Sequence, residues 1–127
     1  MKEYDELITA HIDSVKTVHA PEGGGTVDVQ KLVEDPDSGM CVFHNTYRAG
    51  TVTRYHTHSC SHAVYVLSGT FLANGKEYGP GSMVLFPQGS RMEHGATERE
   101  DAEVLFIWSG ISVKRGFDIR YLNEEQQ

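Results

Sequence analysis

Three histidines fall within seven residues between Gly50 and Gly69, and this cluster constrains the chain more than any other feature. His56 and His58 are two residues apart, so on a β-strand both side chains point to the same face. His62 follows four residues later. It shares that face on an unbroken strand, whereas a turn would place it on the next strand, opposite the first two. Either route can bring three neutral imidazoles together, a ligand set that divalent transition metals favour, and the cluster therefore predicts a metal site.

From Gly50 to Gly69 the sequence reads G-x5-H-x-H-x3-H-x6-G. This pattern resembles the first motif of the cupin superfamily, G-x5-H-x-H-x3,4-E-x6-G. Both glycines, His56 and His58 match that motif position for position, and His62 stands where most cupins have glutamate. The resemblance implies that His56 and His58 are metal ligands and that His62 is a ligand in place of the carboxylate.

The second cupin motif, G-x5-P-x-G-x2-H, is matched less completely. Gly81, Pro87 and Gly89 occupy their expected positions, but the expected histidine falls on Met92. The nearest histidine, His94, comes two residues later, after a Pro-x-Gly turn. The resemblance implies His94 as a ligand if the turn contains two extra residues.

The resemblance covers roughly residues 42–107. The chain is most similar to small single-domain cupins with an all-histidine site, including the acetylacetone-cleaving and 2,4'-dihydroxyacetophenone dioxygenase-like group. It implies an all-β double-stranded β-helix, the jelly-roll barrel. It also implies one divalent transition metal, with iron expected and manganese, zinc or nickel as alternatives.

The pattern of short strands independently favours an antiparallel sandwich or barrel. Turn signals separate the strands at intervals of 8–12 residues, as is typical of such folds, and Asn74-Gly75 is the strongest hairpin signal. The expected strands are 26–34, 40–48, 51–58, 63–67, 70–73, 76–78, 83–86, 103–108 and 111–122. Residues 20–25 and 95–101 are expected to be loops. We expect one domain, with an N-terminal arm at 1–25, the barrel at 26–122 and a tail at 123–127.

Charge and composition narrow the possible partners. The net charge of −7 and the absence of a basic stripe argue against nucleic acid and anionic membranes. No apolar run is long enough to span a bilayer, and the start lacks an apolar signal segment. Cys41 and Cys60 form no pattern that demands a disulfide, so a reduced, cytoplasmic setting is expected. A small-molecule substrate is the expected partner, and the weakly patterned residues 1–20 suggest a homodimer.

Several other residues are weaker candidates for a place in the metal site. Cys60 would share the face of the histidines only on an unbroken strand, and His44 lies outside the motif. Arg91 and Glu93 lie close to His94 and are candidates for contacts to a ligand or for acid–base work, although solvated loop charges explain them more readily. No aspartate is placed to complete a Ser-His-Asp triad. An apolar pocket around the metal would draw on Tyr47, Phe86, Met92, Phe106 and Trp108.

Four neutral imidazoles would leave a divalent ion its full +2 charge, which favours anionic substrates and lowers the pKa of bound groups. The first hypothesis is a non-heme Fe(II) dioxygenase that cleaves a small carbonyl or diketone compound. The alternatives are a non-redox metal isomerase or lyase, and a non-enzymatic metal-dependent protein that binds a small molecule. Fold alone does not decide among them.

Overall fold

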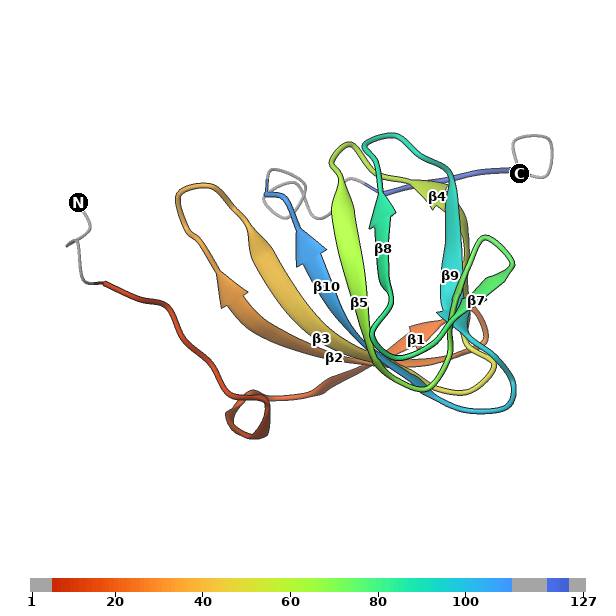
Figure 1. Cartoon of the computed structure of the whole chain (residues 1–127). Helices are drawn as coiled ribbons and strands as arrows, with labels where there is room; N and C mark the ends of the chain where they lie inside the picture. The colour runs from red at the N-terminus through yellow and green to blue at the C-terminus, as the bar shows by residue number, and fades with distance from the viewer. Residues whose placement is uncertain (1–5, 111–118, 124–127) are drawn as a thin grey trace.

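The computed structural model describes residues 6–110 and 119–123, which form two antiparallel sheets packed face to face (Figure 1). The six-stranded sheet has the order β1 (Val18–Glu22), β2 (Gly25–Glu34), β3 (Cys41–Tyr47), β10 (Ala102–Trp108), β5 (His62–Ser68), β8 (Met83–Phe86). The five-stranded sheet has the order β11 (Arg120–Tyr121), β4 (Val52–Thr57), β9 (Met92–Ala96), β6 (Phe71–Ala73), β7 (Lys76–Tyr78). One 3-10 turn, η1 (Ile12–Ser14), precedes β1. The predicted jelly-roll fold is confirmed.

Period-two alternation decides which residues face the interior. In β5, His62, Val64 and Val66 are buried while the residues between them are only partly covered. In β10, Ala102, Val104, Phe106 and Trp108 are buried in the same way. These two strands are antiparallel neighbours, so their buried rows combine into one apolar surface between the sheets.

The turns follow the local chemistry of the sequence. Asn74 and Gly75 both have positive φ, 50° and 78°, as a two-residue hairpin turn between β6 and β7 requires. The predicted hairpin of strands 26–34 and 40–48 is also present, as β2 paired with β3. Of the expected last strand, residues 111–118 lie outside the described residues, and β11 covers only Arg120–Tyr121.

Two expectations about loops were wrong. Residues 20–25 were expected to be a loop, but Ala20 to Glu22 belong to β1, which pairs with β2 across a turn at Gly23-Gly24. Residues 95–101 were expected to be a loop after His94, but β9 continues to Ala96 because it pairs with both β4 and β6. In both places pairing with neighbouring strands overrides the local Gly- and polar-rich composition.

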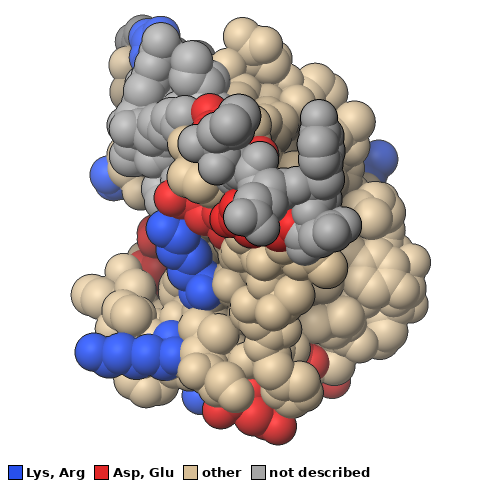
Figure 2. Space-filling model, turned by 90° about the vertical axis from the view of Figure 1, so that its left-hand side faces the viewer, with Lys and Arg blue, Asp and Glu red and all other residues tan. Residues whose placement is uncertain are grey.

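The described surface bears on possible partners in two ways. Among the described residues, no helix has the length and apolar character needed to cross a membrane. On the face shown in Figure 2, Lys and Arg side chains lie apart from one another or beside Asp and Glu, so this face carries no continuous basic stripe.

Candidate metal centre

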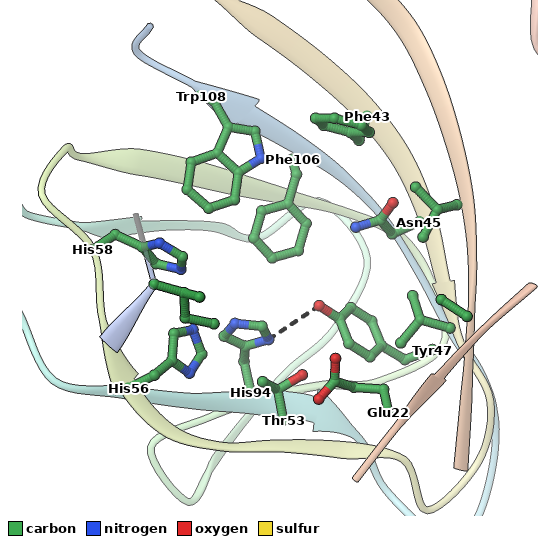
Figure 3. A pocket seen from close by; sticks show the side chains of 14 residues that line it. Glu22, Phe43, Asn45, Tyr47, Thr53, His56, His58, His94, Phe106 and Trp108 are labelled. Atoms are coloured by element: carbon green, nitrogen blue, oxygen red, sulfur yellow. Dashed lines mark hydrogen bonds between the residues drawn. The ribbon is translucent and has the colours of Figure 1, made fainter. Parts of the chain in front are cut away.

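A cavity of about 260 Å³ lies between the two sheets, and three of the predicted histidines line it. His56 comes from β4, His58 from the segment just after β4, and His94 from β9 (Figure 3). The other lining residues are Ala20, Glu22, Val27, Val29, Phe43, Asn45, Tyr47, Thr53, Phe106, Trp108 and Ile119. The cavity therefore draws on both sheets and has an imidazole-rich end.

A register shift in β4 brings its residues to the cavity. Thr53 is opposite His94 and His56 is opposite Met92, so β4 contains one residue more than β9 between these pairs. Such a bulge lets Thr53 and His56, which are three residues apart, both face inward, where they are 5% and 1% exposed. Without it, the period-two rule would place one of them on the outer face.

The two-residue offset in the second motif keeps the histidine on the inner face. Met92 and His94 are two apart on the same strand and both are buried, at 0% and 5% exposure. His94 lines the cavity, whereas Met92 packs in the apolar core. Glu93, between them, points to the opposite face by alternation and is half-buried.

The imidazole rings have the separations expected of ligands that share one ion. The ring centroids are 4.9 Å apart for His56–His58, 5.1 Å for His56–His94 and 5.3 Å for His58–His62. With a metal–nitrogen distance of about 2.1 Å, ligand angles of about 90–110° put such centroids roughly 4.5–5.3 Å apart. In the described ranges, however, no three His, Cys, Asp or Glu side chains form a metal-holding group as they stand.

Burial keeps two of the cavity histidines neutral and ready to coordinate. The pKa of His56 is lowered to about 4, mainly because burial disfavours the charged ring. Its Nδ1–H donates to the Arg54 carbonyl at 2.8 Å, which leaves Nε2 with a free lone pair. Burial also lowers the pKa of His94 well below its usual value, and its Nδ1 lies 3.1 Å from the Tyr47 hydroxyl. One nitrogen held by the protein and one left free is how metal-bound histidines are usually oriented.

His62 is placed differently from the other three. Its ring stacks on Trp108 at 4.2 Å, Phe86 at 5.1 Å and Phe106 at 5.6 Å. Burial, followed by the nearby His58 and His56, lowers its pKa to about 3. A weak contact with the Cys60 main chain opposes this shift in part, but neither buried ring nitrogen has a partner within hydrogen-bond geometry. Unpaired buried nitrogens beside His58 are what a site built for an absent ion would show.

Besides the histidines, the cavity has a second group of polar side chains, and of these the sequence pointed only to Tyr47. Glu22, Thr53 and the Tyr47 hydroxyl gather next to His94, and Asn45 points in from β3 (Figure 3). Burial raises the pKa of Glu22, and the Arg54 charge partly offsets the rise. Alternation already puts Asn45 and Tyr47 on one face of residues 40–48, which was the available signal. Glu22 gave none, because its segment reads as a loop.

The remaining candidates lie away from the cavity. Arg91 packs over the Tyr55 ring at 4.8 Å, and Glu93 faces outward. His44 binds Gln30 and Glu103 on the outer face of the six-stranded sheet. Cys60 is a free, buried thiol in the core, and neither Phe86 nor Met92 lines the cavity. The structure thus gathers His56, His58 and His94 at one cavity, places His62 beside it, and separates the others from it.

Comparisons with known proteins agree with this architecture. A family model described as the ChrR cupin-like domain matches residues 5–112. A search of curated proteins finds no match.

Among solved structures, a proposed acetylacetone dioxygenase from Methylibium petroleiphilum PM1 superimposes with a TM-score of 0.77 at 12% identity, over 100% of this chain and 88% of its own. The polyketide cyclase RemF from Streptomyces resistomycificus superimposes with a TM-score of 0.74 at 20% identity, over 95% and 90%. A predicted oxalate decarboxylase from Thermotoga maritima gives a TM-score of 0.68 at 18% identity, over 80% and 98%. At these identities the likeness shows the fold. Because the family model spans most of the sequence, the chain belongs to the ChrR cupin-like domain family.

Proposed function

We propose that this protein is a metal-dependent cupin enzyme, a non-heme Fe(II) dioxygenase that cleaves a small carbonyl or diketone compound. The observation that carries the proposal is the grouping of His56, His58 and His94 at one end of the cavity, with ring separations that fit a shared ion. These three residues and His62 would hold the metal. When bound, an iron ion would supply a Lewis acid with its full +2 charge and a site for O₂.

The chain's own residues prepare the site in two ways. The Arg54 carbonyl and the Tyr47 hydroxyl hold His56 and His94 by one nitrogen each, which fixes their ring orientations. Burial keeps both rings unprotonated near neutral pH, so protons do not compete with a metal for their lone pairs.

The cavity also limits the size and the chemical character of the substrate. Its volume of about 260 Å³ is just below the usual range of ligand pockets, roughly 300–1,000 Å³, so the substrate is small. Phe43, Phe106 and Trp108 form an apolar wall against which the carbon skeleton of the substrate would pack. Asn45 Oδ1 is buried without a hydrogen-bond partner, so it is available to accept a hydrogen bond from a hydroxyl or enol group of the substrate.

Glu22 stands at the entrance to this cavity. It lines both the cavity and an adjoining surface hollow that includes Arg54 and Tyr121. A carboxyl group with a raised pKa at this position can accept a proton from an entering enolisable carbonyl compound. Glu22 is therefore the residue of this chain best placed for acid–base work.

The likeness to a proposed acetylacetone dioxygenase supports the oxidative reading. The likeness to a polyketide cyclase and to a predicted oxalate decarboxylase favours the second candidate, a metal-dependent isomerase or lyase that acts on the same class of substrate. Both candidates use the same histidines and the same cavity, so only reaction chemistry separates them.

The test is oxygen uptake by protein purified without a histidine tag and loaded anaerobically with Fe(II). Acetylacetone and a set of hydroxyaryl ketones are screened in an oxygen electrode, with His56→Ala protein as the matched control. The proposal expects substrate-dependent uptake by the wild type and none by the variant. Loss of substrate without oxygen uptake, in Zn- or Fe-loaded protein, would select the isomerase or lyase, and no turnover of any compound would leave a binding protein.

A further inference from the structure

A second hollow opens beside the cavity, where the turn between β1 and β2 approaches β4 and β11. It has a volume of about 420 Å³ and is lined by Pro21, Glu22, Gly23, Gly24, Arg54 and Tyr121. The turn can lie this close to β4 because Gly23 has no side chain, and a Cβ there would collide with the Val52 carbonyl. Glu22 lines both spaces, so this outer hollow adjoins the cavity.

Arg54 supplies the positive charge of the outer hollow. Its Cζ lies 4.5 Å from the centroid of the Tyr121 ring, so the guanidinium packs on the ring face. Arg48 and Arg99 form ion pairs with carboxylates, whereas Arg54 forms none with the described residues. Packing on a ring uses only the face of the guanidinium, and its N–H edge stays available to a bidentate acceptor. A carboxylate is the acceptor that matches this edge.

Tyr121 connects the outer hollow with the histidine-rich end of the cavity. It is paired with His56 across β11 and β4, and the two ring centroids are 5.8 Å apart. The Arg54 guanidinium and the His56 ring therefore lie against the same tyrosine, and at most about 10 Å separates Arg54 Cζ from the His56 centroid. One small molecule can thus reach the histidines with one end and Arg54 with the other.

Glu22 is the acidic side chain in the lining of the outer hollow, and it does not prevent an anion from binding there. Burial raises its pKa, and the Arg54 charge offsets only part of the rise. A carboxylate bound to Arg54 would raise this pKa further, because a nearby like charge disfavours the ionised form. Uptake of a proton by Glu22 then removes the repulsion, and the Arg54 charge is left to the bound anion.

We propose that Arg54 and Tyr121 form an anion subsite that holds a carboxylate of the substrate at the mouth of the cavity. The substrate would then be a small oxo acid, with its carbonyl group at the cavity histidines and its carboxylate at Arg54. Its designation as the substrate rests on the proposed function, whereas its binding at Arg54 depends only on the charge and geometry of the outer hollow. A neutral diketone would leave the subsite empty.

The test compares two ligands that differ in one terminal group. Acetylacetone ends in two methyl groups, and 2,4-dioxopentanoate carries a carboxylate in place of one of them. Their dissociation constants are measured by titration calorimetry on Zn-loaded and on metal-free protein, so that the result does not depend on turnover. We expect the wild type to bind the oxo acid roughly tenfold more tightly than the diketone in either form, because a charge-assisted contact is added.

Variants of two arginines decide whether this preference comes from the subsite. Arg54→Gln should remove most of it, and Arg54→Lys should restore part of it, because lysine keeps the charge but not the planar N–H edge. Arg91→Gln is the matched control and should keep the full preference. Arg91 also packs on a tyrosine, with its Cζ 4.8 Å from the Tyr55 centroid, but it lies away from the cavity and the outer hollow.

The outcomes separate the subsite from the proposed function. No binding of the oxo acid by the wild type, a preference unchanged in Arg54→Gln, or a preference lost equally in Arg91→Gln overturns the subsite. A preference that depends on Arg54, in protein that takes up neither metal nor oxygen, supports the subsite and counts against the dioxygenase alone.

Discussion

Replacing His62 with leucine should have opposite effects on the metal-free and the metal-loaded protein. The His62 side chain is 1% exposed, and both ring nitrogens lack hydrogen-bond partners. In the metal-free protein these nitrogens only cost stability, whereas in the loaded protein one of them would bind the ion. Leucine has a similar volume, so the substitution removes the polar atoms without opening a large cavity.

The magnitude follows from the contacts of this ring. A neutral imidazole has one donor and one acceptor, and each costs about 1–3 kcal/mol when buried unpaired. Leucine forfeits the stacking on Trp108 at 4.2 Å, which contributes about 0.5–1.5 kcal/mol. The two unpaired groups together cost about 2–6 kcal/mol, so after the lost stacking is subtracted the metal-free variant should be more stable by about 0.5–5.5 kcal/mol, which raises Tm by roughly 2–20 °C for a domain of this size. Metal at 100 times Kd stabilises the wild type by about 2.7 kcal/mol, and the variant should lose most of this gain.

The assay is thermal unfolding of wild type and His62→Leu, each after chelation and after titration with Zn²⁺ or anaerobic Fe²⁺. His62→Ala is the comparison variant, because its cavity should lower Tm in both states. Two results would refute the reasoning. A lower Tm for metal-free His62→Leu would mean that the ring nitrogens are satisfied. A metal-induced rise in Tm equal to that of the wild type would remove His62 from the ligand set.

Three further predictions follow from the same geometry. Tyr47→Phe removes the hydroxyl 3.1 Å from His94 Nδ1 and should weaken metal binding on the order of 10–100-fold, whereas titration calorimetry that shows unchanged affinity would contradict the orienting role. The metal-free protein should lose stability as the pH falls from 6.5 to about 4. Over this range His56 takes up a proton in the unfolded chain but not in the folded one, where its pKa is about 4. A Tm that does not change across this range would contradict the lowered pKa. His62→Glu should restore the metal binding that is lost in His62→Ala. It should also weaken the binding of azide to the metal-loaded protein, because the carboxylate lowers the net charge of the site from +2 to +1. Azide binding as tight as in the wild type would argue against a metal ligand at this position.

The even spacing of the histidines was the most informative signal in the sequence. Even spacing between His56, His58 and His62 required a shared face or facing strands, and the two-residue offset of His94 from Met92 kept it on the inner face. What the pattern could not predict is the extra residue in β4, because a bulge is set by pairing with β9 rather than by local propensity. That bulge brings Thr53 to the cavity together with His56.

Glu22 and His62 show the other limits of prediction from the sequence. Glu22 lies in a Pro- and Gly-rich stretch that reads as a loop, and only pairing of β1 with β2 makes it part of the cavity wall. His62 was expected to act like the other histidines. Its ring also lies in a cross-strand row with Phe86 of β8 and Trp108 of β10, on which it stacks, and nothing in the sequence pointed to this row. Such cross-strand rows depend on register, which the sequence of one strand does not contain.

Metal stoichiometry tests the central claim most directly. Protein purified without a histidine tag is equilibrated with Fe²⁺ or Zn²⁺, dialysed and measured by elemental analysis, alongside His56→Ala and His94→Ala, with His44→Ala as the control outside the cavity. We predict one metal ion per 14.1 kDa chain in the wild type and in His44→Ala, and far less in the two cavity variants. No bound metal in the wild type, or equal metal in all four proteins, would contradict a metal centre in this cavity.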